Sequence, residues 1–148
     1  MEEDCIIMSL DLFRLLIDFG LVILIWMVQL TIYPSFLYFA REDLVRWHQK
    51  YTLGIAVIVI PLMFGQLGIY GYQLFKSQEY FPILGFAIII IQWILTFVIF
   101  VPLHNAIGQN IHNEQTLQRL VKHNWWRTMI WTFLFVWSSV EFIYAKMI

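Results

Sequence analysis

Residues 81–103 read FPILGFAIIIIQWILTFVIFVPL and contain no acidic or basic side chain. About 20 apolar residues are enough for one α-helix to cross the hydrocarbon core of a bilayer. Three further apolar segments of similar or greater length span approximately residues 12–39, 52–75 and 125–148. Because only residues 76–80 separate the second segment from the third, these two predict a tight antiparallel hairpin. We therefore expect an all-α, up-down bundle of four transmembrane helices that forms one domain over residues 1–148.

The composition indicates the same membrane class. Hydrophobic residues make up 61% of the chain and charged residues 13%, whereas soluble domains are about half apolar and a quarter charged. A core of this size could not bury so much apolar surface, so the lipid bilayer is the expected partner. The net charge of -1 argues against a nucleic-acid partner.

Lysine and arginine residues predict the orientation, because they concentrate in cytoplasmic loops. Six lie in or near the connections after the first and third segments: Arg41, Arg46, Lys50, Arg119, Lys122 and Arg127. Only Arg14, Lys76 and Lys146 lie towards the other side. The sequence therefore predicts cytoplasmic loops at residues 40–51 and 104–124, with both termini outside.

The long third loop carries a helix signal. Asn113 followed by Glu114 is typical of a helix start. Apolar residues then recur at the i, i+3, i+4 spacing of one helix face: Leu117, Leu120 and Val121. We expect a short amphipathic helix that lies on the cytoplasmic face and leads into the fourth segment.

The two halves of the chain resemble each other. Pro34 lies near the end of the first segment and Pro102 near the end of the third, and a basic Leu-Val segment and a returning helix follow each. This pattern indicates two similar helical hairpins related by an axis along the membrane normal. Aligning the halves places His48 opposite Asn124. Chance similarity between apolar sequences is the alternative.

Polar residues gather where the predicted helices end on the cytoplasmic side: His48, Tyr51, His104, Asn105, Asn124 and Arg127. An up-down bundle brings these ends to one membrane surface, where we expect a pocket. We predict catalytic roles for His104, Arg127 and His48, because a guanidinium binds an anionic oxygen and an imidazole moves protons near neutral pH. Asn105, Asn124 and Tyr51 are expected to bind the ligand, and the surrounding aromatic residues suit a flat apolar molecule. Headgroup contacts and helix capping are the competing interpretation.

The sequence does not identify a cofactor. A metal ion could use His48 and His104, with Glu42 or Asp43 as a third ligand. However, the sequence has no His-x-x-x-His or Glu-x-x-His pair that would place two ligands on one helix. The two other histidines look like solvated loop residues: His112 and His123.

Five polar residues lie inside the apolar segments: Asp18, Gln29, Gln66, Gln92 and Glu141. The glutamines are expected to bridge helices through hydrogen bonds. Asp18 and Glu141 are expected to be interfacial carboxylates, one of which could pair with Arg14. The alternative is that these residues line a proton or cation path.

The sequence 101–105, VPLHN, and the sequence 125–128, WWRT, which opens the last helix, resemble a known family. This family comprises small four-helix membrane proteins related to fungal anthrone oxygenases, and many of its bacterial members have no assigned role. Its members tend to end helix three on Val-Pro-Leu/Ile-Asn and to begin helix four on Asn-x-x-Arg-Thr. Here His104 precedes Asn105, which departs from that pattern. The resemblance implies oxidation of a polycyclic phenolic substrate.

The leading hypothesis is thus a membrane protein whose cytoplasmic pocket binds a small aromatic or lipophilic ligand, with oxidation of that ligand as the chemistry that the resemblance implies. One alternative is a non-catalytic subunit or assembly factor that packs against partner membrane proteins or against copies of itself. Another is a transporter or channel subunit, which four short helices without a broken pair argue against.

Overall fold

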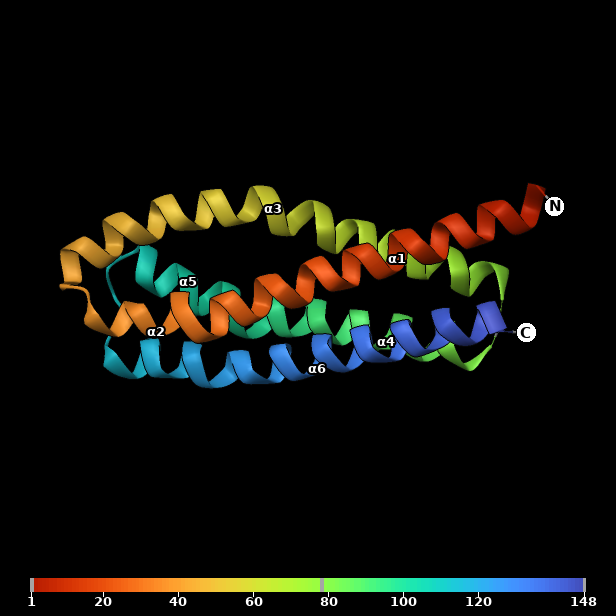
Figure 1. Ribbon diagram of the computed structural model, residues 1–148. Helices are drawn as coiled ribbons and strands as arrows, with labels where there is room; N and C mark the ends of the chain where they lie inside the picture. Colours follow the sequence, from red (N-terminus) through yellow and green to blue (C-terminus); the bar gives the residue numbers. More distant parts are fainter. Residues whose placement is uncertain (1, 78, 148) are drawn as a thin grey trace.

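The computed structural model describes residues 2–77 and 79–147, with side chains for 8–77 and 79–144, and these residues form helices without strands. The first hairpin consists of α1 (Glu2–Met27), η1 (Val28–Ile32), α2 (Tyr33–Ser35), η2 (Phe36–Tyr38) and α3 (Arg41–Lys76). The second consists of α4 (Tyr80–Leu95), η3 (Thr96–Phe100), α5 (Val101–Gly108) and α6 (Glu114–Met147). The long helical segments 2–38, 41–76, 80–108 and 114–147 run antiparallel to their neighbours in sequence along one bundle axis (Figure 1).

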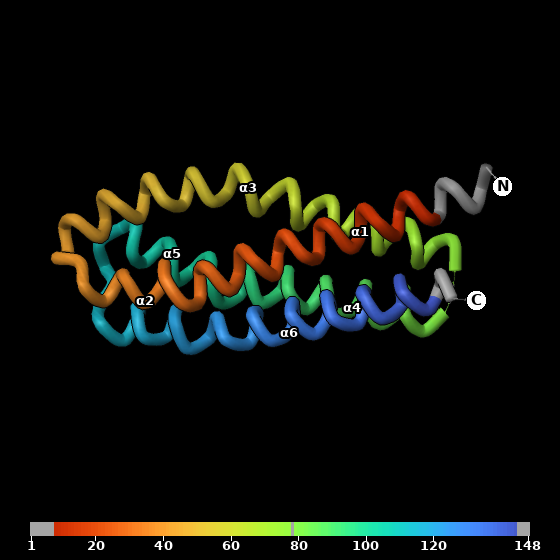
Figure 2. Tube along the Cα trace, in the orientation of Figure 1, coloured from red at the N-terminus to blue at the C-terminus, as the bar shows by residue number. Residues whose placement is uncertain are grey.

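The connections gather at opposite ends of the bundle. Residues 39–40 and 109–113 form what we call the loop end, where segments far apart in the sequence lie together (Figure 2). The opposite end holds the connection between α3 and α4 (Figure 1). Around the bundle, α1 packs against α3 and α6, and α4 packs against α3 and α6. The predicted up-down order of four helices is therefore confirmed.

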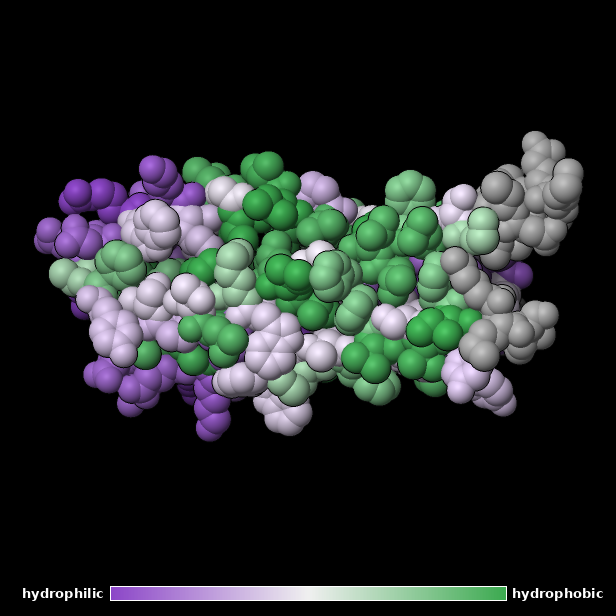
Figure 3. Space-filling view, in the orientation of Figure 1, coloured by the Kyte–Doolittle hydropathy of each residue, from purple (hydrophilic) through white to green (hydrophobic). Residues whose placement is uncertain are grey.

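Three helical segments are long and apolar enough to cross a membrane: Met8–Tyr38, Arg41–Lys76 and Tyr80–Gly108. Their outer faces carry apolar side chains that a soluble protein would cover, such as Leu53, which is 74% exposed, and Val57, which is 76% exposed. Figure 3 shows hydrophilic residues gathered at the loop end and mainly hydrophobic residues over the rest of that face. By length and composition, three of the described helical segments could therefore span a membrane.

The bounds of the predicted connections at 40–51 and 104–124 are too wide, because only residues 39–40 and 109–113 lie outside the helices there. The second helix begins at Arg41, and the third continues to Gly108. The first helix likewise begins at Glu2, well before the predicted residue 12. Apolar composition marks the part of a helix that fits lipid, whereas hydrogen bonding and packing decide how far the helix extends.

The predicted surface helix is likewise not a separate element. It forms the first turns of α6, where Leu117 and Leu120 are buried in the bundle core. The predicted helix start is confirmed, because Oδ1 of Asn113 accepts a hydrogen bond from the backbone amide of Thr116 at 2.9 Å. The predicted end of the fourth helix at Ile148 lies outside the described residues.

Each hairpin contains a π-helical turn directly before its proline. In η1 the amide of Tyr33 bonds to the carbonyl of Val28, and in η3 the amide of Val101 bonds to the carbonyl of Thr96. A proline lacks the amide hydrogen and crowds the preceding turn, so a widened turn accommodates it. This shared distortion at Pro34 and Pro102 supports the predicted likeness of the two hairpins.

The three glutamines bridge helices, as the sequence predicts. Each amide bonds across a helix interface: Gln29 to Asn124 at 2.9 Å, Gln66 to Asp18 at 2.7 Å, and Gln92 to the backbone carbonyl of Arg127 at 3.0 Å. Such bonds join apolar helices that lipid would otherwise solvate equally well.

The prediction of an interfacial Asp18 is wrong. Its side chain is 1% exposed and accepts hydrogen bonds from Gln66 and from the Tyr70 hydroxyl, both at 2.7 Å. Arg14 is buried as well, and it forms a salt bridge with Asp11 at 3.0 Å. Partners of this kind are what permit polar groups to stay inside a bundle.

Gly85 gives Tyr70 the room to reach Asp18. A methyl group added at Gly85 would lie 2.6 Å from Cε1 of Tyr70, whereas one added at Gly54 would meet nothing within 4 Å. We expect Gly85→Ala to lower the free energy of unfolding by about 1–3 kcal/mol, the usual cost of overpacking. The matched variant Gly54→Ala should be neutral or stabilising, because alanine favours helices. Unfolding in detergent measures both, and equal stability of the two variants would contradict this prediction.

Candidate functional site

A cavity of about 510 Å³ lies in the half of the bundle nearer the loop end. Its inner wall is apolar and includes Leu24, Ile25, Met63, Phe100 and Trp131. Its rim consists of exposed residues on α3 and around α5: Gln49, Ile60, Val101, Asn105 and Gln109. The cavity therefore opens between α3 and the third helix.

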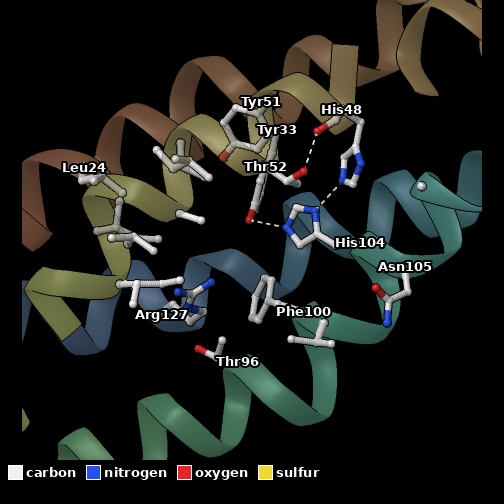
Figure 4. A pocket seen from close by; sticks show the side chains of 18 of the residues that line it. Leu24, Tyr33, His48, Tyr51, Thr52, Thr96, Phe100, His104, Asn105 and Arg127 are labelled. Carbon is white, nitrogen blue, oxygen red and sulfur yellow. Dashed lines mark hydrogen bonds between the residues drawn. The ribbon is translucent and has the colours of Figure 1, made fainter. Parts of the chain in front are cut away.

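Three side chains on the cavity wall form a continuous hydrogen-bonded chain (Figure 4). The Tyr33 hydroxyl bonds to Nε2 of His104 at 3.0 Å, and Nδ1 of His104 bonds to Nε2 of His48 at 2.7 Å. The imidazole rings are stacked with centroids 5.0 Å apart. The three residues come from α2, α5 and α3, so the chain joins three elements at one point.

Arg127 reaches the cavity from α6. The residue is 7% exposed, and its guanidinium carbon lies 4.5 Å from the ring centroid of Phe100 and 4.8 Å from that of Trp131. Among the described side chains, no carboxylate pairs with it; the nearby polar groups are the hydroxyls of Tyr33 and Tyr51. Its buried Nε atom has no hydrogen-bond partner. Aromatic faces offset part of the cost of a buried cation, but an anion would offset more.

The cavity thus brings together five of the six predicted site residues: His48, Tyr51, His104, Asn105 and Arg127. Tyr51 lines it from α3 and packs its ring edge-on against Phe36, with centroids 5.7 Å apart. Tyr33 is a site residue that sequence analysis missed. A tyrosine near a helix end looks like an interfacial anchor, and only its place beside a proline on the repeated pattern could have singled it out.

The two asparagines lie in different places. Asn105 is on the exposed rim of the cavity. Asn124 is fully buried, bonds to Gln29 and does not line the cavity. The structure therefore does not place Asn124 on the cavity wall: residues i and i+3 differ by about 60° around a helix, which turns Asn124 towards η1 while Arg127 faces the cavity.

The described side chains contain no group of three histidine, cysteine, aspartate or glutamate residues that could hold a metal ion. Glu42 and Asp43 are exposed and form no part of the cavity wall, so neither completes a site with His48 and His104. Both facing nitrogens of the histidine pair are already engaged with each other. The predicted third ligand is thus not supplied by either acidic residue.

The other two histidines are not the solvated loop residues that the sequence predicts. His112 lies in the connection between α5 and α6 but is 5% exposed, and burial lowers its pKa, with the nearby Arg41 guanidinium acting in the same direction. His123 is a half-buried residue of α6. His112 is thus a connecting residue that packs into the bundle, whereas His123 belongs to a helix that begins before it.

The role of Asn124 in joining α6 to η1 can be tested by a double-mutant cycle. We expect Asn124→Ala and Gln29→Ala each to lower the free energy of unfolding by about 1 kcal/mol, as interhelical hydrogen bonds in membranes do. Their effects should be non-additive, because either change alone breaks the same bond. Unfolding of the two single variants and the double variant measures this coupling, and strict additivity would refute the assignment.

Comparison with protein-family models, curated proteins and solved structures found no match to this chain. The resemblance to anthrone-oxygenase-like proteins therefore rests on the quoted residues, and function has to be argued from the cavity.

Proposed function

We propose that this chain is a membrane protein that binds, in the cavity, a small lipophilic or aromatic molecule carrying one anionic oxygen. The observation that carries the proposal is Arg127, a buried cation that faces the cavity without a carboxylate partner among the described residues. In this reading α6 crosses the bilayer with the other three helices, and the loop end is cytoplasmic, as the distribution of basic residues predicts.

The electrostatics favour an anion over a neutral ligand. Removing a guanidinium from water costs several kcal/mol unless an opposite charge or a set of hydrogen bonds replaces the water. The aromatic rings of Phe100 and Trp131 supply part of this, yet neither can accept a strong hydrogen bond from Arg127. A phenolate, enolate or carboxylate oxygen can, and charge-assisted bonds of this type are among the strongest in proteins.

The remaining walls specify the rest of the ligand. Apolar side chains from α1, α3, η3 and α6 surround the cavity, so the body of the ligand is apolar. The hydroxyls of Tyr33 and Tyr51 interact electrostatically with the guanidinium, and Figure 4 shows the three side chains around one space. An anionic oxygen placed there would contact all three groups, while the apolar body would fill the space towards Leu24 and Met63.

Replacing Arg127 with Gln tests the proposal. The probe is an alkyl-substituted 4-nitrophenol at a pH above its own pKa, where it is an anion with visible absorbance. We expect Arg127→Gln to weaken its binding roughly 10- to 100-fold, because a charge-assisted bond worth about 1.5–3 kcal/mol is lost. Arg119→Gln is the matched control, since this exposed arginine lies on the same helix outside the cavity. Titration of the purified protein in detergent or nanodiscs measures both dissociation constants.

A second measurement depends only on the native protein. The methyl ether of the same probe has neither charge nor acidic proton, and we expect it to bind at least about tenfold more weakly than the anion. Equal binding of the ether and the anion, or of Arg127→Gln and Arg119→Gln, would refute the proposal. A non-catalytic subunit that only packs against partners would give that result.

A further inference from the structure

We infer that the ligand reaches the cavity as a neutral acid and gives its proton to the chain Tyr33–His104–His48, so that it is held as the anion beside Arg127. This inference rests on the proposed function, because it assumes that the cavity binds an anionic oxygen. It adds the chemical class of the ligand, a lipophilic weak acid such as a phenol, an enol or a carboxylic acid. It also assigns a proton-transfer role to Tyr33.

The geometry provides an unbroken route for the proton. Tyr33 is next to Arg127 at the cavity, and the two bonds of 3.0 and 2.7 Å lead from its hydroxyl through the His104 ring to His48. His48 lies at the polar end of the cavity, beside the exposed Gln49 and Gln109 of the rim. Heavy-atom distances of this size are those at which protons transfer between positioned groups.

The transfer balances in protons and electron pairs. The ligand O–H bond breaks as its proton moves to the Tyr33 oxygen, and the proton of Tyr33 moves to Nε2 of His104. The proton on Nδ1 of His104 then moves to Nε2 of His48, which releases its own Nδ1 proton to water. No electron leaves or enters. One proton appears in solution for each ligand bound, and each residue of the chain ends neutral with one transferable proton.

The hydrogen bonds of the chain can run in one direction when the ligand is the neutral acid and in the opposite direction when it is the anion. Before transfer, Tyr33 donates to His104 and can accept from the ligand O–H. After transfer, His48 donates to His104, His104 donates to Tyr33, and Tyr33 donates to the ligand anion. Because neutral imidazole has one donor and one acceptor nitrogen, the same three side chains support both directions.

The far end of the chain has an unused nitrogen where the proton must leave. Nδ1 of His48 is buried and has no hydrogen-bond partner. A methyl group added at Gly108 would lie 4.0 Å from this nitrogen, so Gly108 is a neighbour past which the proton could leave. The charged and titratable groups around the chain are Arg127 on α6, Tyr51 on α3 and His112 in the 109–113 connection.

The opening of the cavity suits a neutral acid that arrives from lipid. Its rim includes the exposed apolar residues Ile60 on α3 and Val101 on α5, in addition to polar residues nearer the loop end. A neutral acid dissolves in hydrocarbon far better than its anion, whose desolvation costs much more. Once inside, the acid meets both a positive charge that stabilises its anion and a route that removes its proton.

The experiment mixes the protein rapidly with the alkyl-4-nitrophenol at a pH one unit below the probe's pKa, where the probe is mostly neutral. The phenolate absorbance follows ionisation, and a pH indicator in weak buffer follows the released proton. For the native protein we expect phenolate to form with release of one proton per bound probe. Tyr33→Phe should weaken binding of preformed phenolate about tenfold, because the hydroxyl that donates to the bound anion is lost. At probe concentrations that saturate each variant, it should also slow phenolate formation roughly 100-fold, the lower range for positioned proton transfer.

A second variant and two controls separate proton transfer from packing. His104→Gln breaks the chain at its centre and should slow phenolate formation to a similar extent, which keeps the test valid if Tyr33→Phe does not fold. Tyr38→Phe and His123→Gln are matched changes outside the chain, and Tyr38 is 89% exposed. Both should ionise the probe at the native rate.

Two results would overturn the inference while the proposed function stands. One is native rates of phenolate formation in both Tyr33→Phe and His104→Gln, and the other is binding of the probe to the native protein in its neutral form without proton release. Loss of the Arg127 dependence of phenolate binding would overturn the inference together with the proposed function.

Discussion

A guanidinium buried without an acidic partner is the constraint around which the cavity half of the bundle is organised. Arg127 lies between the rings of Phe100 and Trp131, and the hydroxyls of Tyr33 and Tyr51 are its polar neighbours among the described residues. A buried charge of this kind is stable only if surrounding groups replace the water that it has lost. The aromatic rings, the two hydroxyls and the open space in front of them therefore form one electrostatic unit, which a ligand anion would complete.

The two halves of the bundle differ in how many of their buried polar groups have hydrogen-bond partners. Near the end opposite the loops, Asp18 receives two short hydrogen bonds and Arg14 has a carboxylate, a serine and a glutamine as partners. The described buried polar atoms that lack a partner lie from the middle of the bundle to the loop end, and they include Nε of Arg127 and Nδ1 of His48. Satisfied polar networks hold helices together, whereas unsatisfied ones are stable in the presence of a further molecule. The polar groups near the end opposite the loops are therefore paired within the bundle, whereas the unpaired groups lie in the half where the proposed ligand would bind.

Sequence reasoning identified the number and order of the helices, because long apolar segments have few alternatives in a chain of this composition. It also placed the three glutamines between helices, since an amide at that depth requires a partner. It failed at the helix ends, because hydropathy reports contact with lipid and not the extent of hydrogen bonding. It grouped His48, His104 and Arg127, which line one cavity, but it placed Asn124 with them and overlooked Tyr33. The rotation of each helix about its axis is set by packing against its neighbours, and periodicity within one segment does not contain that information.

The π-helical turns explain why the site forms where it does. Each turn adds a residue to the helical repeat just before a proline, which rotates the residues that follow relative to those before it. Tyr33 directly follows η1 in the first hairpin, and His104 lies just beyond η3 in the second. The hydrogen bond between them thus joins the displaced segments of the two hairpins at the point where they face each other. If the hairpins arose from one ancestral unit, the same distortion in each would bring chemically different side chains to a shared interface. The cavity is the space that remains between the hairpins beside this interface.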